Sequence, residues 1–408
     1  MKLFLYAGRD SLKSVIARSH ISLARASSVA TGILEDVRLN GDAALIHYSA
    51  QFDKYALTKE SIKVSKEDVK KAVARVDKKI LDALAHASRN IERYHKKQLA
   101  GIKKHWSVAV QPGVTVGEKT SPIDSAGCYV PGGRAAYPST VLMTAIPAKV
   151  AGVKRVAVTS PPPIPDVVLA ACSICGVSEV YRIGGAQAVG ALAYGTASIP
   201  KVSKIVGPGN KYVMSAKNLV YGTVDIDMPA GPSEVLIIAD DSANAGFITA
   251  DLWAQAEHDP DAQCVLVTTS KKMLDAVSRQ APKNSVGLLA KTMAECIEFA
   301  NLYAPEHLEI MTKNPKAVAG KITNAGAVFI GPYSPVAAGD YASGGNHVLP
   351  TGGAARFSSP LSVRNFLKYT SVQEISKEGL KKLGTTIQTL AEAEGLEKHK
   401  KSVEKRLN

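Results

Sequence analysis

From about residue 120 onward, short runs rich in Val and Ile alternate with helical, mostly Ala-rich stretches, and this alternation limits the folds open to the chain. Strands that alternate with helices predict parallel sheets joined by crossover helices, which is the α/β class. The expected strands are Arg155–Thr159, Val180–Ile183, Lys204–Val206, Glu234–Ala239, Cys264–Thr268 and Ala327–Ile330. Ligands of such folds gather at the carboxyl ends of the strands, so we expect the site there.

The length and charge of the chain bear on its organisation and partners. With 408 residues it exceeds what one hydrophobic core supports, so two or more packed units are expected. Much of the net charge of +14 lies within Lys59–Lys104. Apolar residues recur there at helical spacing, and Ser65 with Asp68 offers a capping start, which predicts one long amphipathic helix with a solvated basic face. We therefore expect no nucleic-acid partner.

The apolar runs and the cysteines indicate the cellular compartment of the protein. No apolar run approaches the roughly 20 residues of a membrane span, and Arg9 and Asp10 interrupt any signal-peptide core. Five cysteines are an odd and sparse number, which favours a reducing cytoplasm and no membrane association. Cys172 and Cys175 have the spacing of a metal or redox pair, but no second pair accompanies them, so buried structural cysteines are expected.

One glycine loop resembles a dinucleotide-binding turn in part. The run Gly207-Pro208-Gly209-Asn210-Lys211-Tyr212 follows an expected strand, and Tyr212 stands where the third glycine of the fingerprint would be. A phosphate or nucleotide loop and an ordinary strand-to-helix turn both remain open from this pattern.

Three groups of polar residues are candidates for chemistry. Gln255 and His258 lie three apart near the end of a helix expected over 242–259, as half of a metal site or as a stabilised helix terminus. The neighbours Glu306 and His307 follow Pro305 on a turn, as a pair of bases or as surface polar groups. In the Gly-rich segment Ala338–Pro350, either Asp340 or His347 is a candidate metal ligand.

Several segments together resemble the histidinol dehydrogenase family. They are Gly127–Arg134, Gly184–Val189, Gly207–Asn210, Ala230–Glu234, Gln255–Asp259, Ala304–His307 and Ser343–His347. The resemblance is strongest from Pro122 to Glu374 and weakest in the N-terminal third. A series of matched segments in one order is more specific than any single loop.

The resemblance implies an NAD-dependent enzyme of histidine biosynthesis, which oxidises L-histidinol through L-histidinaldehyde to L-histidine with two NAD⁺ and a bound zinc. It implies proton acceptors at Glu306 and His307. The implied zinc ligands are Gln255, His258, Asp340 and His399. The implied substrate contacts are Ser233, Gln255, His258, His307, Asp340, Glu394 and His399. The implied NAD contacts are Tyr129, Gln187 and Asn210.

The family also implies an architecture and a partner. Two incomplete Rossmann-like domains with parallel sheets would carry small helical appendages at both ends. The implied boundaries are 1–22 for an N-terminal helical appendage, 23–127 with 234–361 for the metal and substrate domain, 128–233 for the NAD domain, and 362–408 for the C-terminal appendage. That last segment would be exchanged in a homodimer, so that His399 and Glu394 reach the site of the other subunit.

Three alternatives define the tests of this interpretation. A relative on the same scaffold could oxidise another alcohol, such as a sulfonated diol, although Glu394, His399 and the run Arg134–Ser139 favour histidinol. A zinc hydrolase would use Glu306 to activate water and would need no nicotinamide. A basic nucleic-acid-binding protein would bind with an affinity that falls steeply with salt.

Overall fold

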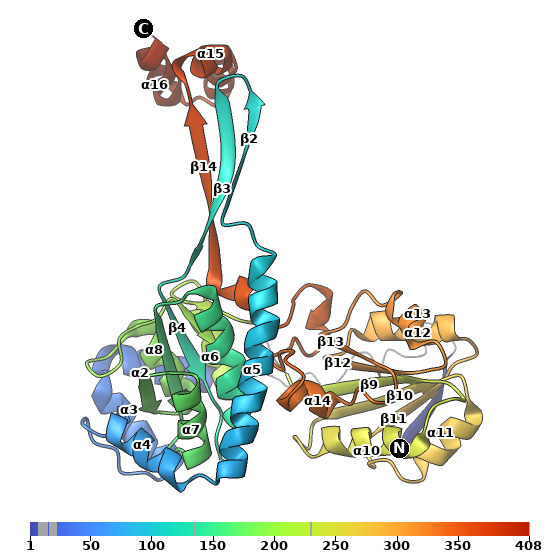
Figure 1. The fold of residues 1–408 in the computed structure, drawn as a ribbon. Helices are drawn as coiled ribbons and strands as arrows, with labels where there is room; N and C mark the ends of the chain where they lie inside the picture. Colours follow the sequence, from blue (N-terminus) through green and yellow to red (C-terminus); the bar gives the residue numbers. More distant parts are fainter. Residues whose placement is uncertain (7–14, 16–22, 134, 229–230, 408) are drawn as a thin grey trace.

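The computed structural model describes residues 1–6, 15, 23–133, 135–228 and 231–407. Arg134 and Ala230, which belong to two of the motifs above, lie outside this part of the chain. Two lobes, each built around a parallel sheet, lie next to each other, and a long arm projects away from them (Figure 1). The α/β class expected from the sequence is thus confirmed.

The first lobe contains a five-stranded parallel sheet in the order β6-β5-β4-β7-β8. Its strands are β4 (Ser125–Tyr129), β5 (Arg155–Ser160), β6 (Glu179–Arg182), β7 (Lys204–Val206) and β8 (Asp225–Ile226). Its crossover helices are α6 (Pro138–Ala151), α7 (Asp166–Ile174), α8 (Gly185–Tyr194) and α9 (Lys211–Val220). Both faces of the strands are buried, which explains their continuous apolar runs.

The helices that precede this sheet pack on it. They are α2 (Leu23–Asn40), α3 (Asp42–Tyr48), the π-helix η2 (Ser49–Asp53), α4 (Lys66–Arg75) and α5 (Lys78–Ala100). Helix α2 contacts α8 and α9, α4 contacts α7, and α5 contacts α6. The segment 23–100 therefore shares a core with 125–228, whereas the expected boundaries grouped it with 234–361.

The second lobe contains a six-stranded parallel sheet in the order β1-β11-β10-β9-β12-β13. Its strands are β1 (Lys2–Leu5), β9 (Glu234–Ala239), β10 (Gln263–Thr268), β11 (Val286–Leu289), β12 (His307–Met311) and β13 (Ala327–Ile330). Its helices are α10 (Ala245–Ala256), α11 (Lys271–Ser278), α12 (Met293–Tyr303), α13 (Pro315–Ala319) and α14 (Val336–Tyr341). Residues 2–5 thus form an edge strand where a helical appendage was expected; the rest of that expectation falls mainly outside the described residues.

The arm is a three-stranded antiparallel sheet that carries two helices at its far end (Figure 1). Its strands are β2 (His105–Gln111), β3 (Val114–Pro122) and β14 (Leu367–Ile375), and its helices are α15 (Lys377–Ala393) and α16 (Glu397–Leu407). Two short 3₁₀ helices, η3 (Ala354–Arg356) and η4 (Val363–Phe366), precede β14 in the chain. Val363 and Phe366 are buried in the core of the first lobe, and this anchors the arm.

The expected long basic helix is in fact two helices, and this prediction was wrong. Helix α4 begins as expected, with the Ser65 hydroxyl accepting a hydrogen bond from the Asp68 amide at 3.0 Å. At Val76 the backbone adopts an extended conformation, which ends α4. The Asp77 carboxylate then caps α5 by accepting a hydrogen bond from the Lys79 amide at 2.7 Å. An aspartate cap stabilises a new helix start.

Two further features of the fold concern membrane-spanning helices and the cysteines. Within the described ranges, no helix combines the length and the apolar character that crossing a bilayer requires. All five cysteines are buried and free, which confirms that Cys172 and Cys175 are structural, and burial raises the pKa of both thiols.

Candidate active site between the two lobes

Glu306 and His307 lie where α12 gives way to β12. Helix α12 ends at Ala304, which adopts a left-handed conformation with φ of 49°, and Pro305 prevents its continuation. His307 is the first residue of β12, an interior strand between β9 and the edge strand β13 of the second sheet. Both side chains are buried, so these residues are not the polar surface pair that the sequence left open.

Both side chains are fixed by the backbone of Glu234 on the neighbouring strand β9. The Glu306 carboxylate accepts a hydrogen bond from the Glu234 amide at 2.8 Å, and His307 Nδ1 lies 2.9 Å from the Glu234 carbonyl oxygen. A carbonyl only accepts, so Nδ1 carries the proton. His307 Nε2 has no hydrogen-bond partner and lies 3.7 Å from a carboxylate oxygen of Asp340.

Burial and mutual charge shift the acidity of all three groups. Burial raises the pKa of Glu306 to about 7, against the opposing effect of His307. For His307, burial acts to lower the pKa, but the carboxylates of Glu306 and Asp340 outweigh it and raise the pKa to about 9. Burial likewise acts to raise the pKa of Asp340, but His307 and two further histidines hold it below its ordinary value. A carboxyl group that titrates near neutrality suits proton transfer.

Three of the expected metal ligands come from α10 and α14. Gln255 lies in the last turn of α10, and His258 lies just past its end, so the expected helix over 242–259 is shorter at both ends. Both amide atoms of Gln255 are buried without a hydrogen-bond partner. His258 is near enough to lower the pKa of Asp340 through its charge. A buried amide without partners is costly, so the Gln255 amide suits a site that is completed by a ligand.

The remaining expected ligands lie far from these three residues within the folded subunit. Glu394 caps the end of α15 and His399 lies in α16, at the tip of the arm (Figure 1). Among the residues that the structure describes, no three His, Cys, Asp or Glu side chains lie close enough to hold a metal ion. Within one subunit the structure therefore does not bring His399 to the other three expected metal ligands.

His347, the alternative metal ligand to Asp340, serves instead as a link between the lobes. Its Nδ1 lies 3.0 Å from the Asp340 carbonyl oxygen, and its Nε2 lies 3.4 Å from the hydroxyl of Thr140 on α6. Burial lowers the pKa of His347. Both ring nitrogens are thus engaged within the protein. The pattern of the sequence did not single out Thr140, because its role depends on a contact 207 positions away.

The expected NAD contacts lie at the carboxyl edge of the first sheet. Tyr129 ends β4, and its hydroxyl accepts a hydrogen bond from the Gly185 amide at 3.1 Å. Gln187, in the first turn of α8, is buried, and its side-chain oxygen has no partner. Asn210 caps α9 by accepting from the Tyr212 and Val213 amides at 3.0 and 3.2 Å. The loop after β7 thus leads directly into a capped helix start.

A cavity of about 70 Å³ joins the two halves of the site. Its lining combines the loop after β7 with Ser233, Glu306 and His347. Ser233 and His307 flank the amino ends of β9 and β12, whereas Tyr129 and Asn210 lie at the carboxyl edge of the first sheet. The expected site residues therefore lie at the carboxyl edge of the first sheet and at the amino edge of the second sheet.

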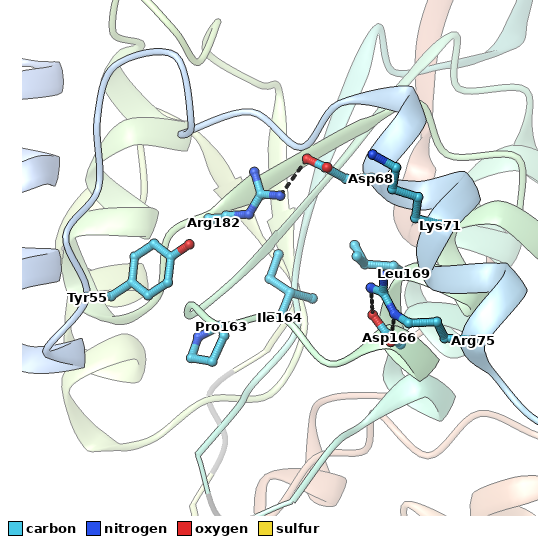
Figure 2. A pocket seen from close by; sticks show the side chains of 9 residues that line it. All are labelled: Tyr55, Asp68, Lys71, Arg75, Pro163, Ile164, Asp166, Leu169 and Arg182. Atoms are coloured by element: carbon cyan, nitrogen blue, oxygen red, sulfur yellow. Dashed lines mark hydrogen bonds and ion pairs between the residues drawn. The ribbon is translucent and has the colours of Figure 1, made fainter.

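A larger hollow, of about 210 Å³, lies on the first lobe away from these residues (Figure 2). Two ion pairs cross it: Arg182 binds Asp68 at 2.8 Å, and Arg75 binds Asp166 through two bonds of 2.7 Å. Its other lining residues are Tyr55, Lys71, Pro163, Ile164 and Leu169. None of the site residues expected from the sequence lines it.

On the strand that begins at His307, the buried carboxyl group of Glu309 faces the half-buried carboxyl group of Asp251. Glu309 on β12 accepts a hydrogen bond from the Val336 amide at 2.8 Å, at the start of α14. Burial and the neighbouring Asp251 raise the pKa of Glu309 to about 8. A carboxyl group with a raised pKa binds its proton more tightly in the folded state, so it favours folding below its unfolded pKa and loses this effect as the pH rises to about 8.

We expect Glu309→Gln to stabilise the protein at alkaline pH. The amide can still accept from Val336 and carries no charge, so the variant should gain about 1–3 kcal/mol of unfolding free energy at pH above 8, and little near pH 5. Thermal melting at both pH values measures this difference. The exposed control Glu67→Gln should change little at either pH, and a Glu309→Gln variant less stable than the parent at alkaline pH would contradict the prediction.

Comparison with known proteins identifies the family of this chain. The family model of histidinol dehydrogenase matches residues 16–407. Histidinol dehydrogenase of Methanocaldococcus jannaschii is 48% identical, with 98% of this chain and 96% of that protein covered. That of Methanococcus maripaludis is 47% identical, with 97% of each covered. The crystal structure of histidinol dehydrogenase from Elizabethkingia anophelis has a TM-score of 0.93 at 39% identity, and the match covers 100% of this chain and 98% of that one.

A family match over nearly the whole chain, with relatives close to half identical, confirms the resemblance read from the motifs. The chain is therefore a dehydrogenase, and it belongs to the histidinol dehydrogenase family.

Proposed function

We propose that this enzyme oxidises L-histidinol through L-histidinaldehyde to L-histidine, with a bound zinc ion and two NAD⁺ per turnover. The observation that carries the proposal is the pair Glu306 and His307, which is buried and fixed by Glu234 beside a cavity that both lobes line. The NAD⁺ bound at the first lobe would supply the hydride acceptor, and Tyr129, Gln187 and Asn210 would hold it.

His307 is the base for the alcohol step in this proposal. Its Nδ1 proton is held by the Glu234 carbonyl, so Nε2 is the atom that accepts the proton of the substrate hydroxyl. The carboxylate of Asp340 keeps the pKa of His307 high, and a cation bound at Asp340 would oppose this effect and favour the neutral imidazole that a base requires.

Glu306 is the base for the aldehyde step. With a pKa near 7, it takes a proton from water as the water adds to the aldehyde carbon, which gives the hydrate that loses the second hydride. The cavity between the lobes keeps the reactive aldehyde away from bulk water between the two steps.

The zinc site of the proposal combines Gln255, His258 and Asp340 with His399 of the partner subunit. The nitrogen and oxygen donors fit zinc, and the unpartnered amide of Gln255 supports a ligand there. When bound, the metal would orient the imidazole and amine of the substrate. Glu394 and His399 lie at the end of an arm, away from their own lobes, which supports a homodimer that exchanges these arms (Figure 1).

Removal of the metal provides a test of this donor set. We expect protein treated with a chelator to lose NADH formation from histidinol, and added zinc to restore two NADH per histidinol. Gln255→Leu should weaken zinc binding by about 10- to 100-fold, without lowering the melting temperature of the metal-free protein, because it removes polar atoms that have no partner.

The outcomes separate the alternatives. Gln263→Leu serves as the control, since that amide bonds only to the Asp261 carbonyl at 3.0 Å, and its zinc affinity should stay unchanged. Full NADH formation by metal-stripped protein would contradict the zinc site. Absence of NADH formation by zinc-loaded protein would contradict the dehydrogenase reaction, and a preference for a sulfonated diol would contradict the substrate.

A further inference from the structure

A buried ion pair lies beneath the glycine loop of the first lobe. Lys217 on α9 binds the carboxylate of Asp227, which follows β8, and both side chains are only 1% exposed. The two residues line the cavity between the lobes, together with Gly207, Ser233 and Glu306. Neither residue has a part in the chemistry proposed above.

The pair holds both backbone polar groups of Gly207. The Lys217 ammonium donates to the Gly207 carbonyl at 3.0 Å, and the Asp227 carboxylate accepts from the Gly207 amide at 2.7 Å. Gly207 has a φ of 116°, which favours glycine, and a Cβ there would collide with the Tyr129 carbonyl oxygen. The ion pair thus fixes a strained backbone position directly against the end of β4.

The elements on either side of Gly207 carry the expected cofactor contacts. Tyr129 is the residue that Gly207 touches, and Asn210, three positions later, caps α9. Since Lys217 lies on α9, one side chain links the helix to the loop at its start. A displacement of Gly207 would therefore move Asn210 relative to Tyr129.

We propose that Lys217 and Asp227 are positioning residues that hold the Gly207–Asn210 loop in the conformation that binds the pyrophosphate and ribose portion of NAD⁺. This inference rests on the proposed NAD-dependent reaction. The pair acts through the loop and does not touch the reacting atoms, so it sets the affinity for the dinucleotide and leaves the affinity for the alcohol unchanged.

A purely stabilising role is a weaker explanation of this pair. Burying two charges costs as much as their attraction returns, so a buried ion pair adds little stability over apolar residues of similar size. The nearby pair Lys204–Asp225 joins β7 to β8 at 2.7 Å, with Asp225 half exposed. It does not contact Gly207 in the structure, and it provides a matched control.

The test compares KM values for NAD⁺ and histidinol in three zinc-loaded variants. The double variant Lys217→Met with Asp227→Asn buries no lone charge. We expect its KM for NAD⁺ to rise about tenfold or more. Its KM for histidinol should stay within about twofold, and its kcat at saturating NAD⁺ within about threefold, of the values of the parent enzyme. Lys217→Ala alone, which leaves space for a small amine, should show at least as large a rise, and ethylammonium should partly reverse it. Lys204→Met should leave both KM values unchanged.

Each outcome decides the proposal. An unchanged KM for NAD⁺ in the folded double variant, an equal rise of both KM values, or the same rise in Lys204→Met would overturn it. If the Lys217 variants do not fold, amide exchange of the parent enzyme decides: the Gly207 amide must already be protected without NAD⁺, and protection that appears only with NAD⁺ overturns the proposal. Failure of the proposed function is distinct, because the parent enzyme would then form no NADH.

Discussion

Replacing Glu306 with glutamine is expected to block aldehyde oxidation while sparing the alcohol step. The glutamine oxygen can still accept from the Glu234 amide, so the side chain keeps its place and loses only its capacity to take a proton. With histidinaldehyde supplied directly, we expect the rate of NADH formation to fall by about 100- to 10,000-fold. The first NADH formed from histidinol, measured in a single turnover, should fall by less than about tenfold.

His307→Asn is the matched comparison for this experiment. It removes the base at Nε2, so oxidation of histidinol should fall strongly, whereas oxidation of supplied aldehyde should fall less. An equal loss of both steps in Glu306→Gln would refute the division of labour between the two neighbours.

Mixing two inactive variants is expected to restore activity if the arm completes the site of the partner subunit. His399→Ala removes the ligand at the arm tip, and His307→Asn removes the base in the cavity. In a mixed dimer, one site combines an intact His307 with an intact His399, and the other site carries both substitutions. Random exchange of equal amounts makes half of the dimers mixed, so about one quarter of the sites should be active.

The control for this experiment mixes His307→Asn with Glu306→Gln. Both substitutions lie in the same lobe, so no mixed dimer regains an intact site, and activity should stay at the level of the parents. If exchange of subunits is proven by mass and activity does not return in the His399 mixture, the shared site is wrong.

The strands of the two parallel sheets could be predicted where their side chains are buried on both faces. The bounds of β7 and β9 agree with the sequence prediction residue for residue, since their buried apolar runs are short and bounded by turn residues. The bounds of the half-exposed edge strand β13 agree as well, because turn residues also bound its apolar run. The helix break at Val76 was missed because the apolar spacing continues across it, although Asp77 offered the signal of a new cap.

The arm was missed for a different reason. The side chains of β2 and β14 are largely exposed, so neither strand shows the buried apolar run of the sheets. Strand β14 also pairs with β3, roughly 250 positions earlier in the chain, from Leu367 opposite Pro122 to Ile375 opposite Val114. A pairing at such a separation leaves no local pattern to detect.

For the site as well, the motifs predicted some residues, whereas the roles of others depend on the three-dimensional structure. The motifs indicated the reactive pair Glu306 and His307, which the structure buries together beside Asp340. They did not indicate the backbone of Glu234 that orients the pair, or the ion pair of Lys217 and Asp227, because these roles arise from strand pairing and from the return of a helix to its own loop.

The segment that carries His347 also limits how the protein can move. Asn346 donates to the Met143 carbonyl at 2.7 Å, and Asn90 donates to the Ala342 carbonyl at 2.9 Å, so two helices of the first lobe hold the segment that follows α14 of the second lobe. A hinge motion that swung the lobes apart would break these bonds and the contact between His347 and Thr140. Entry to the cavity is then expected to depend on local rearrangement of short segments, without separation of the two lobes.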